Sequence, residues 1–377
     1  MQDHALKNRL AAIDVMRGIV MILMTLDHAS EAFNGGRLMT DSVGMWKPGM
    51  ALPEAQFLTR WITHLCAPTF VLLAGTALAL STDSRMRRGD SPGAIDRHLA
   101  IRGVLLIALD AAWMSMAILS PGQVLFQVLY AIGAAFLFMI PLRRLSDGAL
   151  LAVGLSLAVL DEPLAFVLMK TGLSGTLPAA LLVMPGGFLE GHFIVGYPAL
   201  PWLAIMCVGW VLGRRLLGWP AADRSRIAAR VLAGWGVALL VLFAVVRGAN
   251  ALGNMGLPRE DGSLVQWLHV SKYPPSVSFD SLELGIASLM LAALFLACER
   301  KPEFLAPVRT LGQTALFYYL LHIHVMMIVA HLTGVHGKLG LPGAYLGAAC
   351  TVLALYPAVR WYGRYKVAHP GGWRQYV

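Results

Sequence analysis

The sequence predicts an all-α, polytopic membrane protein, with about ten transmembrane helices in a single bundle. Hydrophobic residues make up 57% of the 377 residues and charged residues only 14%, with a mean hydropathy of +0.65. A soluble chain would carry about 25% charged residues. The 38 Gly and 20 Pro are spread through the apolar stretches, which argues against a disordered or collagen-like chain.

Apolar segments recur along the whole chain, so residues 1–377 are interpreted as one integral-membrane domain. Each crossing of the hydrocarbon core requires about 20 predominantly apolar residues. The expected helices cover residues 12–33, 57–81, 99–119, 122–141, 147–169, 198–217, 229–247, 281–298, 310–332 and 341–359.

The basic residues predict how these helices are oriented. Most of the 30 Lys and Arg, among them Arg85, Arg214 and Arg374, lie in connections on the side of the N-terminus. Because positive residues accumulate in cytoplasmic loops, both termini are expected in the cytoplasm and the protein in the cell (inner) membrane. Asp14 and Arg17 interrupt the first apolar stretch, which argues against a cleavable signal peptide. The basic clusters lack interleaved aromatic residues, so no nucleic-acid partner is expected.

Ionisable residues within the first helix are candidates for function, because each costs about 2.5 to 3.5 kcal/mol to insert. Asp14, Arg17, Met21, Thr25 and His28 recur at spacings of three and four residues, which places them on one helical face. Asp14 and Arg17 can form an ion pair near the cytoplasmic end of the helix. An interfacial ion pair without chemistry is the competing interpretation.

Two histidines, His28 and His64, are expected at similar depth near the outer ends of the first two helices. Pro68 cannot donate to the carbonyl of residue 64, so the second helix should bend there. A bent helix with an unpaired carbonyl is typical of a wet cavity. For His64 alone, a packing role is the competing interpretation. Asp27 lies about 100° around the helix from His28, so another helix is better placed to supply the partner of His28.

The ninth expected helix adds further candidates for the site. Tyr318 and His322 lie one turn apart on one face, whereas His324 lies about 160° further round. The histidines of this region have no standard metal-ligand spacing and no nearby acid, so no metal is expected. No pair of helices offers the spaced histidines of a bis-histidine haem protein. The four cysteines lie in apolar stretches without a CxxC pair and are interpreted as small hydrophobic residues.

The stretch DVMRGIVMILMTLDH at 14–28 resembles the opening helix of integral-membrane acyltransferases. In that pattern an Arg follows an Asp by three residues, and a His follows the Asp by fourteen. The wider chain resembles the heparan-α-glucosaminide N-acetyltransferase-like family. This likeness also rests on THLCAPTFVLLAGTALALS at 63–81, YPALPWLAIMCVGWVLG at 197–213, KYPPS at 272–276 and LFYYLLHIH at 316–324. It covers most of the chain, and the order of the motifs makes it specific.

The resemblance implies an acyltransferase with a ten-helix core. Its members move an acetyl group from cytoplasmic acetyl-CoA to an amine or hydroxyl of a sugar or glycan beyond the membrane. The implied partners are acetyl-CoA, a saccharide acceptor and the lipid bilayer, with a homodimer left open. Eukaryotic members keep their proposed catalytic histidine in the outer loop after the first family helix, but residues 34–56 contain no histidine. The role would therefore pass to His28 or His64.

Acetyl transfer requires a base, and a neutral histidine at the outer end of a polar helical face is suited to that task. His28 and His64 are the expected catalytic residues, with Asp14 and Arg17 at the entrance of the cofactor. Asp27, Tyr318 and His322 are expected to support the substrate. Direct transfer and an acetyl-histidine intermediate both remain open. The competing function is a secondary transporter or flippase that uses the same polar face as a path.

The predicted orientation can be tested by labelling single cysteines placed at Gly89 and Asn250 in a background without the native cysteines. We expect a membrane-impermeant maleimide added to intact cells to label the Asn250 site, because it lies in an outer connection. The Gly89 site should react only after permeabilisation. Labelling of the Gly89 site in intact cells would contradict the orientation.

Overall fold

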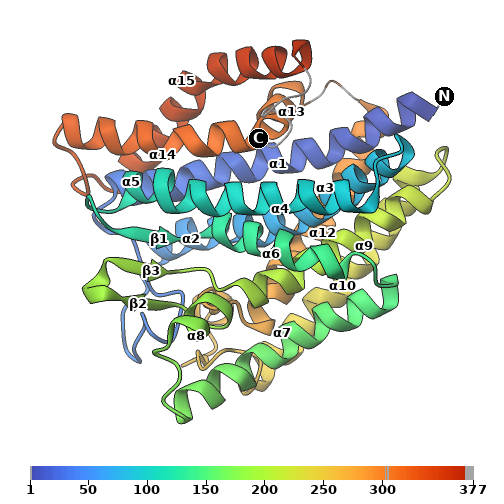
Figure 1. The fold of residues 1–377 in the computed structure, drawn as a ribbon. Helices are drawn as coiled ribbons and strands as arrows, with labels where there is room; N and C mark the ends of the chain where they lie inside the picture. Colours follow the sequence, from blue (N-terminus) through green and yellow to red (C-terminus); the bar gives the residue numbers. More distant parts are fainter. Residues whose placement is uncertain (1, 302, 304, 370–377) are drawn as a thin grey trace.

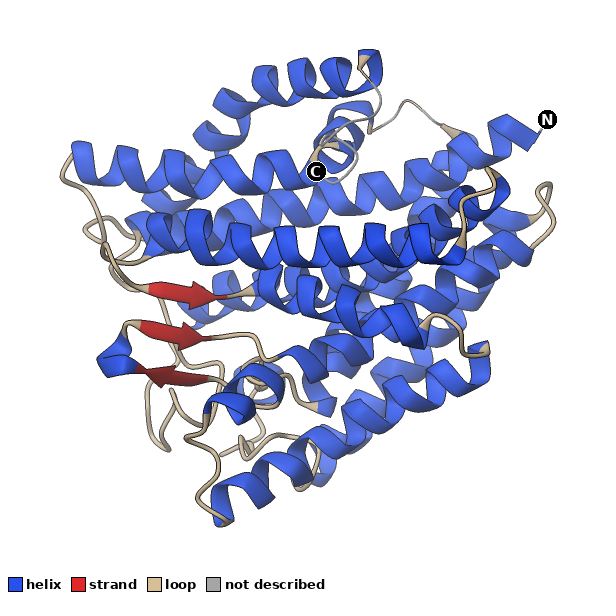
Figure 2. Ribbon diagram, in the orientation of Figure 1, coloured by secondary structure: helices blue, strands red, loops and turns tan. Residues whose placement is uncertain are grey.

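Long helices dominate the computed structural model, which describes residues 2–301, 303 and 305–369 (Figure 1). A small three-stranded sheet lies at one end of the helices, opposite the N-terminus (Figure 2). Arg374, expected in the cytoplasmic C-terminal segment, lies outside the described residues.

The elements follow one another along the chain in a nearly all-helical order. They are α1 (Gln2–Phe33), α2 (Glu54–Ile62), the 3₁₀ turn η1 (Thr63–Leu65), α3 (Cys66–Arg87), α4 (Pro92–Leu109), the π-helical turn η2 (Asp110–Met114), α5 (Ser115–Ile118), β1 (Val124–Phe126), α6 (Val128–Leu142), α7 (Asp147–Lys170), α8 (Leu177–Leu182), β2 (Gly186–Phe188), the 3₁₀ turn η3 (Leu189–Gly191), β3 (Phe193–Val195), α9 (Ala199–Gly218), α10 (Arg224–Ala249), α11 (Leu264–Leu268), α12 (Val277–Arg300), α13 (Ala306–Gln313), α14 (Ala315–Leu332) and α15 (Leu341–Ala368).

Eight helical segments of the described chain are long and apolar enough to cross a membrane, which confirms the all-α polytopic membrane class. The first two are composite, because α2–η1–α3 and α4–η2–α5 each continue through an irregular turn. Two further expected helices correspond to α6, which is apolar but shorter, and to α1, which carries several ionisable residues. The eight segments are Glu54–Arg87, Pro92–Ile118, Asp147–Lys170, Ala199–Gly218, Arg224–Ala249, Val277–Arg300, Ala315–Leu332 and Leu341–Ala368.

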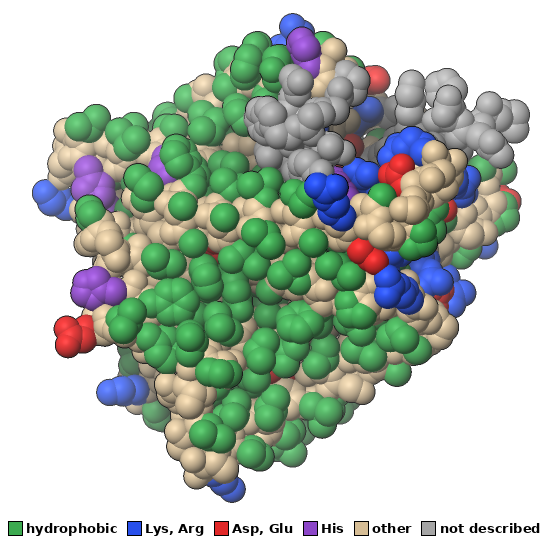
Figure 3. Space-filling model, in the orientation of Figure 1, with side chains coloured by type: hydrophobic (Ala, Val, Ile, Leu, Met, Phe, Trp, Pro, Cys, Tyr) green, Lys and Arg blue, Asp and Glu red, His purple; other side chains and the backbone are tan. Residues whose placement is uncertain are grey.

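The surface is consistent with a lipid environment. Hydrophobic side chains cover much of the face shown in Figure 3, while Lys and Arg gather at the end that carries the N-terminus. Large apolar side chains such as Met116, Val245 and Leu353 are exposed. An exposed apolar surface of this extent is stable when acyl chains cover it.

The helix that carries His64 is interrupted near Pro68, as the sequence predicts. α2 ends at Ile62, the 3₁₀ turn η1 holds His64, and α3 begins at Cys66. The proline ring removes the donor that a regular helix would offer to the His64 carbonyl. Arg60, just before this interruption, and His64, within it, are both buried, so the composite helix directs two polar side chains into the interior.

A buried carboxylate fixes α6 against α4. Asp110 lies in the π-helical turn that ends α4 and is fully buried. Its Oδ2 accepts backbone N–H bonds from Gln127 (2.6 Å) and Tyr130 (2.8 Å) at the start of α6. Unpaired N–H groups at a helix start favour an anionic acceptor. Asp110 therefore acts as an N-terminal cap supplied by a neighbouring helix.

Glycines bring several helix pairs into backbone contact. A Cβ placed on Gly209 of α9 would lie 2.1 Å from the carbonyl oxygen of Leu72 on α3. Gly103 of α4 and Gly133 of α6 face each other, and a Cβ on either would lie 2.7 or 2.5 Å from the carbonyl oxygen of the other. Close packing of small residues drives helix association in lipid, where burial of apolar surface contributes little.

A buried arginine organises the long connection between α10 and α12. Arg247 is fully buried, and its guanidinium satisfies acceptors along residues 254–269. Unpaired carbonyls would be costly at this depth. The carbonyls that accept from Arg247 belong to Leu257 (2.7 Å), Gln266 (2.7 Å), Trp267 (3.2 Å) and His269. This connection is thereby held against the sheet-side end of the helices, next to Lys272.

Candidate functional site

The polar face of α1 packs against α14. Thr25 Oγ1 lies 2.7 Å from the hydroxyl of Tyr318, and His28 Nδ1 lies 2.7 Å from His322 Nε2. Both partners come from one face of α14, because Tyr318 and His322 are one turn apart and their rings stack at 5.3 Å. The structure therefore brings together four of the polar residues that the sequence places on two separate helical faces.

The hydrogen bonds of His322 define the proton positions of the histidine pair. His322 is fully buried, and its Nδ1 lies 2.7 Å from the backbone oxygen of Tyr319. A carbonyl only accepts, so Nδ1 carries the proton, and Nε2 of the neutral ring accepts from Nδ1–H of His28. The remaining nitrogen, His28 Nε2, then has a free lone pair. It has no hydrogen-bond partner within the described part of the chain, so it is available to accept a proton from a substrate.

A network of ion pairs lies beside this histidine pair. Arg60 Nη1 lies 2.5 Å from Asp27 Oδ1, and Arg60 Nη2 lies 2.5 Å from Asp41 Oδ2. Arg37 forms a second pair with Asp27 at 2.8 Å. Asp27 is thus engaged by two arginines, in agreement with the expectation that it is not the partner of His28. Arg60 joins α1, the 34–53 connection and α2 through one guanidinium.

His64 belongs to this ionic network and does not contact His28. Its Nε2 lies 3.4 Å from Asp41 Oδ1, and its ring packs against Phe279. The 3.4 Å contact does not satisfy hydrogen-bond geometry, so both ring nitrogens are buried without a hydrogen-bond partner in the described chain. The two expected catalytic histidines therefore lie in different environments, one in a histidine pair and one beside a carboxylate.

The charge of Asp41 is stabilised by its neighbours. Asp41 lies in the connection before α2 and is 2% exposed. Burial raises the pKa of this carboxyl, but the nearby Arg60 and His64 lower it by more than burial raises it. The pKa is therefore held well below its ordinary value. Asp41 is therefore ionised throughout the neutral range, and Arg60 has two permanent anions to bridge.

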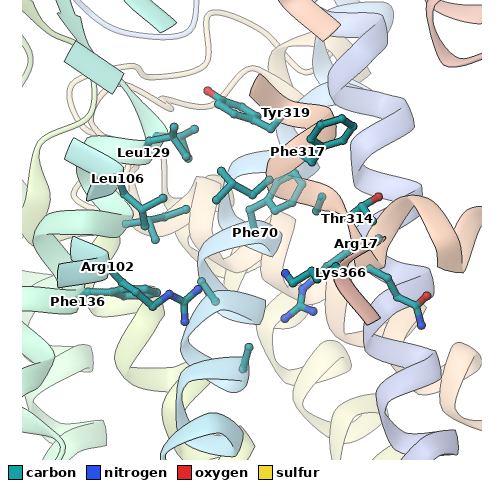
Figure 4. A pocket seen from close by; sticks show the side chains of 18 of the residues that line it. Arg17, Phe70, Arg102, Leu106, Leu129, Phe136, Thr314, Phe317, Tyr319 and Lys366 are labelled. Atoms are coloured by element: carbon teal, nitrogen blue, oxygen red, sulfur yellow. The ribbon is translucent and has the colours of Figure 1, made fainter. Parts of the chain in front are cut away.

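A cavity of about 370 Å³ opens between α1, α3, α4, α6, α13, α14 and α15. Arg17, Arg102 and Lys366 lie at one end and Tyr319 at the other, with apolar side chains such as Phe70 between them (Figure 4). This volume is within the range of small-molecule sites. Because the Tyr319 carbonyl also binds His322, one end of the cavity adjoins the histidine pair.

The structure contains the Asp14–Arg17 ion pair that the spacing predicts, with 3.2 Å between Oδ1 and Nη1. Arg17 also donates from Nη2 to the carbonyl of Leu73 on α3 at 3.2 Å. These two contacts direct the guanidinium to the wall of the cavity, whereas Asp14 is buried behind it. Asp14 is therefore placed to orient Arg17.

Several site residues were not identified from the sequence. Arg60 falls inside an expected spanning helix, so the cost of burying a charge could have singled it out. Asp41 and Lys272 lie in connections, where a charged residue is ordinary, and no sequence signal separates them. Arg102 and Lys366 belong to helices distant in sequence and meet Arg17 only in the fold.

The described residues contain no group of three or more His, Cys, Asp or Glu side chains arranged to hold a metal ion. His324 stacks on Trp113 at 4.3 Å between ring centres, and His331 stacks on His336 at 4.4 Å. These three histidines line a separate groove beside α5 and the C-terminal half of α14.

Comparison with known families gives one match. Residues 9–245 match the family described as heparan-alpha-glucosaminide N-acetyltransferase, catalytic. The matched segment is more than half of the chain. It includes most of α1, all of α2, the turn with His64, and the cavity-lining helices α3, α4 and α6. No curated protein matches the chain.

The Arg60 network predicts a large loss of stability when its guanidinium is removed. Arg60→Ala should lower the free energy of unfolding by about 3 to 5 kcal/mol, because it leaves buried Asp41 without its arginine and Asp27 with Arg37 alone. Arg60→Lys should lose less, since it keeps one charge but not the forked geometry.

The matched control is Arg87→Ala, which removes an exposed pair with Asp83 and should cost less than about 1 kcal/mol. Chemical unfolding of the purified protein in detergent micelles gives both values. Equal effects of Arg60→Ala and Arg87→Ala would show that the network does not stabilise the fold.

Proposed function

We propose that this chain, which belongs to the heparan-α-glucosaminide N-acetyltransferase catalytic family of membrane acetyltransferases, transfers an acetyl group from acetyl-CoA to a saccharide. The donor enters from the cytoplasm, and the acceptor is an amine or hydroxyl of a sugar or glycan on the outer side of the membrane. The protein lies in the cell (inner) membrane with both termini cytoplasmic. The last point rests on the distribution of its basic residues.

The observation that carries the proposal is the hydrogen-bonded pair of His28 and His322. Neutral His322, oriented by the Tyr319 carbonyl, accepts at Nε2 a hydrogen bond from Nδ1–H of His28. His28 Nε2 is then the general base that removes a proton from the acceptor. The acceptor atom attacks the thioester carbonyl, the new bond forms as the carbon–sulfur bond breaks, and the thiolate of CoA leaves. An acetyl group carried temporarily by Nε2 of His28 is the other route that the same lone pair permits.

The cavity provides groups suited to the donor. The phosphates of CoA are anionic, and Arg17, Arg102 and Lys366 supply cations at one end of the cavity. Apolar side chains along the walls, including Phe70, Leu106 and Leu129, suit the largely uncharged pantetheine arm. The far end adjoins His322, so an arm that follows the cavity brings its thioester towards the histidine pair.

His28→Ala should reduce acetyl transfer by about 10²- to 10⁴-fold, because the variant lacks the general base. Its affinity for acetyl-CoA should stay near that of wild type, since the cations of the cavity are unchanged. His64→Ala should be the milder change, because His64 contacts Asp41 and not the histidine pair.

Transfer is measured with acetyl-CoA and purified protein, using cell-envelope glycans as acceptor, and donor binding is measured separately by titration. A His28→Ala protein that retains more than about a tenth of wild-type turnover could not have lost its general base. The role would then pass to His64 or to Tyr318 and His322.

Arg17→Ala should weaken acetyl-CoA binding by about tenfold or more, since it removes a charge-assisted contact with a phosphate. Arg17→Lys should retain part of the affinity. Arg88→Ala, which removes an exposed arginine of the α3–α4 connection, is the matched control and should bind normally. If Arg17→Ala aggregates while Arg17→Lys binds the donor as well as wild type, the Asp14–Arg17 pair has only a structural role.

A further inference from the structure

Lys272 is a buried basic residue that forms no ion pair with any described residue. Its side chain belongs to a residue that is 2% exposed, and among the described residues no carboxylate lies within ion-pair distance of its ammonium. Its Nζ lies over the ring of Tyr273, 5.2 Å from the ring centroid. The backbone explains the position of the residue, because its N–H donates to the Asp41 carbonyl at 2.8 Å.

The other cations near Lys272 have carboxylate partners of their own. Arg37 pairs with Asp27, and Arg60 pairs with both Asp27 and Asp41. The Lys272 ammonium is the remaining cation. An unpaired buried charge costs several kcal/mol, so such a group is retained at the expense of stability.

Glu283 of α12 is the other carboxyl near Lys272. Its Oε1 is buried and has no hydrogen-bond partner in the described part of the chain, and no ion pair joins it to the lysine. Glu283 therefore does not neutralise Lys272 by direct contact.

The phenol of Tyr273 reports the same electrostatic environment. Burial raises its pKa, but the neighbouring charges of Lys272 and Arg60 outweigh burial and lower it. Tyr273 lies in the connection before α12, and its hydroxyl is 3.2 Å from that of Tyr197 and 3.5 Å from Arg60 Nη2. The region between these groups favours a negative charge.

We propose that Lys272 binds an anionic group of the acceptor, and that the acceptor is therefore a saccharide carrying a carboxylate or a phosphate. The juxtaposition of an unpaired buried ammonium with two fully paired carboxylates supports this assignment. That the bound saccharide is the acceptor of the acetyl group rests on the proposed acetyltransferase function. An anionic group bound to the Lys272 ammonium supplies its counter-ion. This contact holds the sugar beside the ion pairs of Asp27, Arg60 and Asp41, next to His28.

The test compares wild type with Lys272→Met, Lys272→Arg and the control Lys170→Met, which changes an exposed lysine at the end of α7. Each full-length protein is titrated in detergent with glucosamine 6-phosphate, glucuronate, glucosamine and inorganic phosphate. At least one of the two anionic sugars should bind wild type about 10- to 100-fold more tightly than glucosamine. This preference should vanish in Lys272→Met, persist in part in Lys272→Arg and be unchanged in Lys170→Met.

The same titrations distinguish the two kinds of anion. Preference for glucosamine 6-phosphate identifies a phosphorylated acceptor, and preference for glucuronate identifies an acidic sugar. Binding of inorganic phosphate alone, without either sugar, would overturn the assignment to a saccharide. An equal affinity of wild type for charged and neutral sugars, or a preference that survives in Lys272→Met, would overturn the role of Lys272.

Thermal unfolding of the ligand-free proteins separates binding from a structural role. Lys272→Met should be at least as stable as wild type, because it replaces an uncompensated charge with an apolar side chain of similar length. A lower melting temperature would overturn the proposal, since it would mean that Lys272 stabilises the fold through Glu283 or another acid.

Acetyl transfer from acetyl-CoA to the same sugars separates this inference from the proposed function. If wild type acetylates anionic and neutral sugars alike and Lys272→Met is unaffected, the inference fails and the acetyltransferase stands. If Lys272-dependent binding of an anionic sugar is observed but wild type transfers no acetyl group to any sugar, the proposed function fails. The anion-binding role of Lys272 would still hold in that case.

Discussion

The guanidinium of Arg60 is the interaction on which the sheet-side half of the structure depends. It bridges Asp27 on α1 and Asp41 in the following connection, and a buried carboxylate without a cationic partner would be costly. The bridge fixes the path of the 34–53 connection over the ends of α1 and α2. That path in turn places the Asp41 carbonyl where it receives the N–H of Lys272. One buried ion-pair network thus aligns α1, the 34–53 connection and α2, and the Asp41 carbonyl adds the distant segment that carries Lys272.

The interior is divided into two chemical environments with the histidine pair between them. On one side lies the cavity, which has apolar walls and carries its cations at the end away from the histidine pair. On the other side Asp27, Arg37, Asp41, Arg60 and Lys272 form a dense ionic cluster. His28 and His322 lie at the junction, where an uncharged proton carrier is compatible with both surroundings. Their neutrality follows from their partners, because a backbone carbonyl and a second imidazole supply no charge.

Helical periodicity made the polar face of α1 predictable, because the spacing from Asp14 to His28 is a local property of one helix. The Tyr318–His322 face was equally accessible. The sequence could not show that these two faces meet, since the partners lie 294 residues apart. The bend at Pro68 was predictable for the same local reason, but the neighbour of His64 was not. Asp41 comes from a connection without periodic structure, so only the folded chain brings it to His64.

The glycine contacts between α3 and α9, and between α4 and α6, hold each helix pair in backbone contact. Carbonyl oxygens there fill the space that a methyl group would need. α4 and α6 both line the cavity, and α9 supports α3, which lines it as well. In the proposed reaction only the acetyl group would cross the barrier, so the membrane would remain sealed to both the nucleotide and the sugar during turnover.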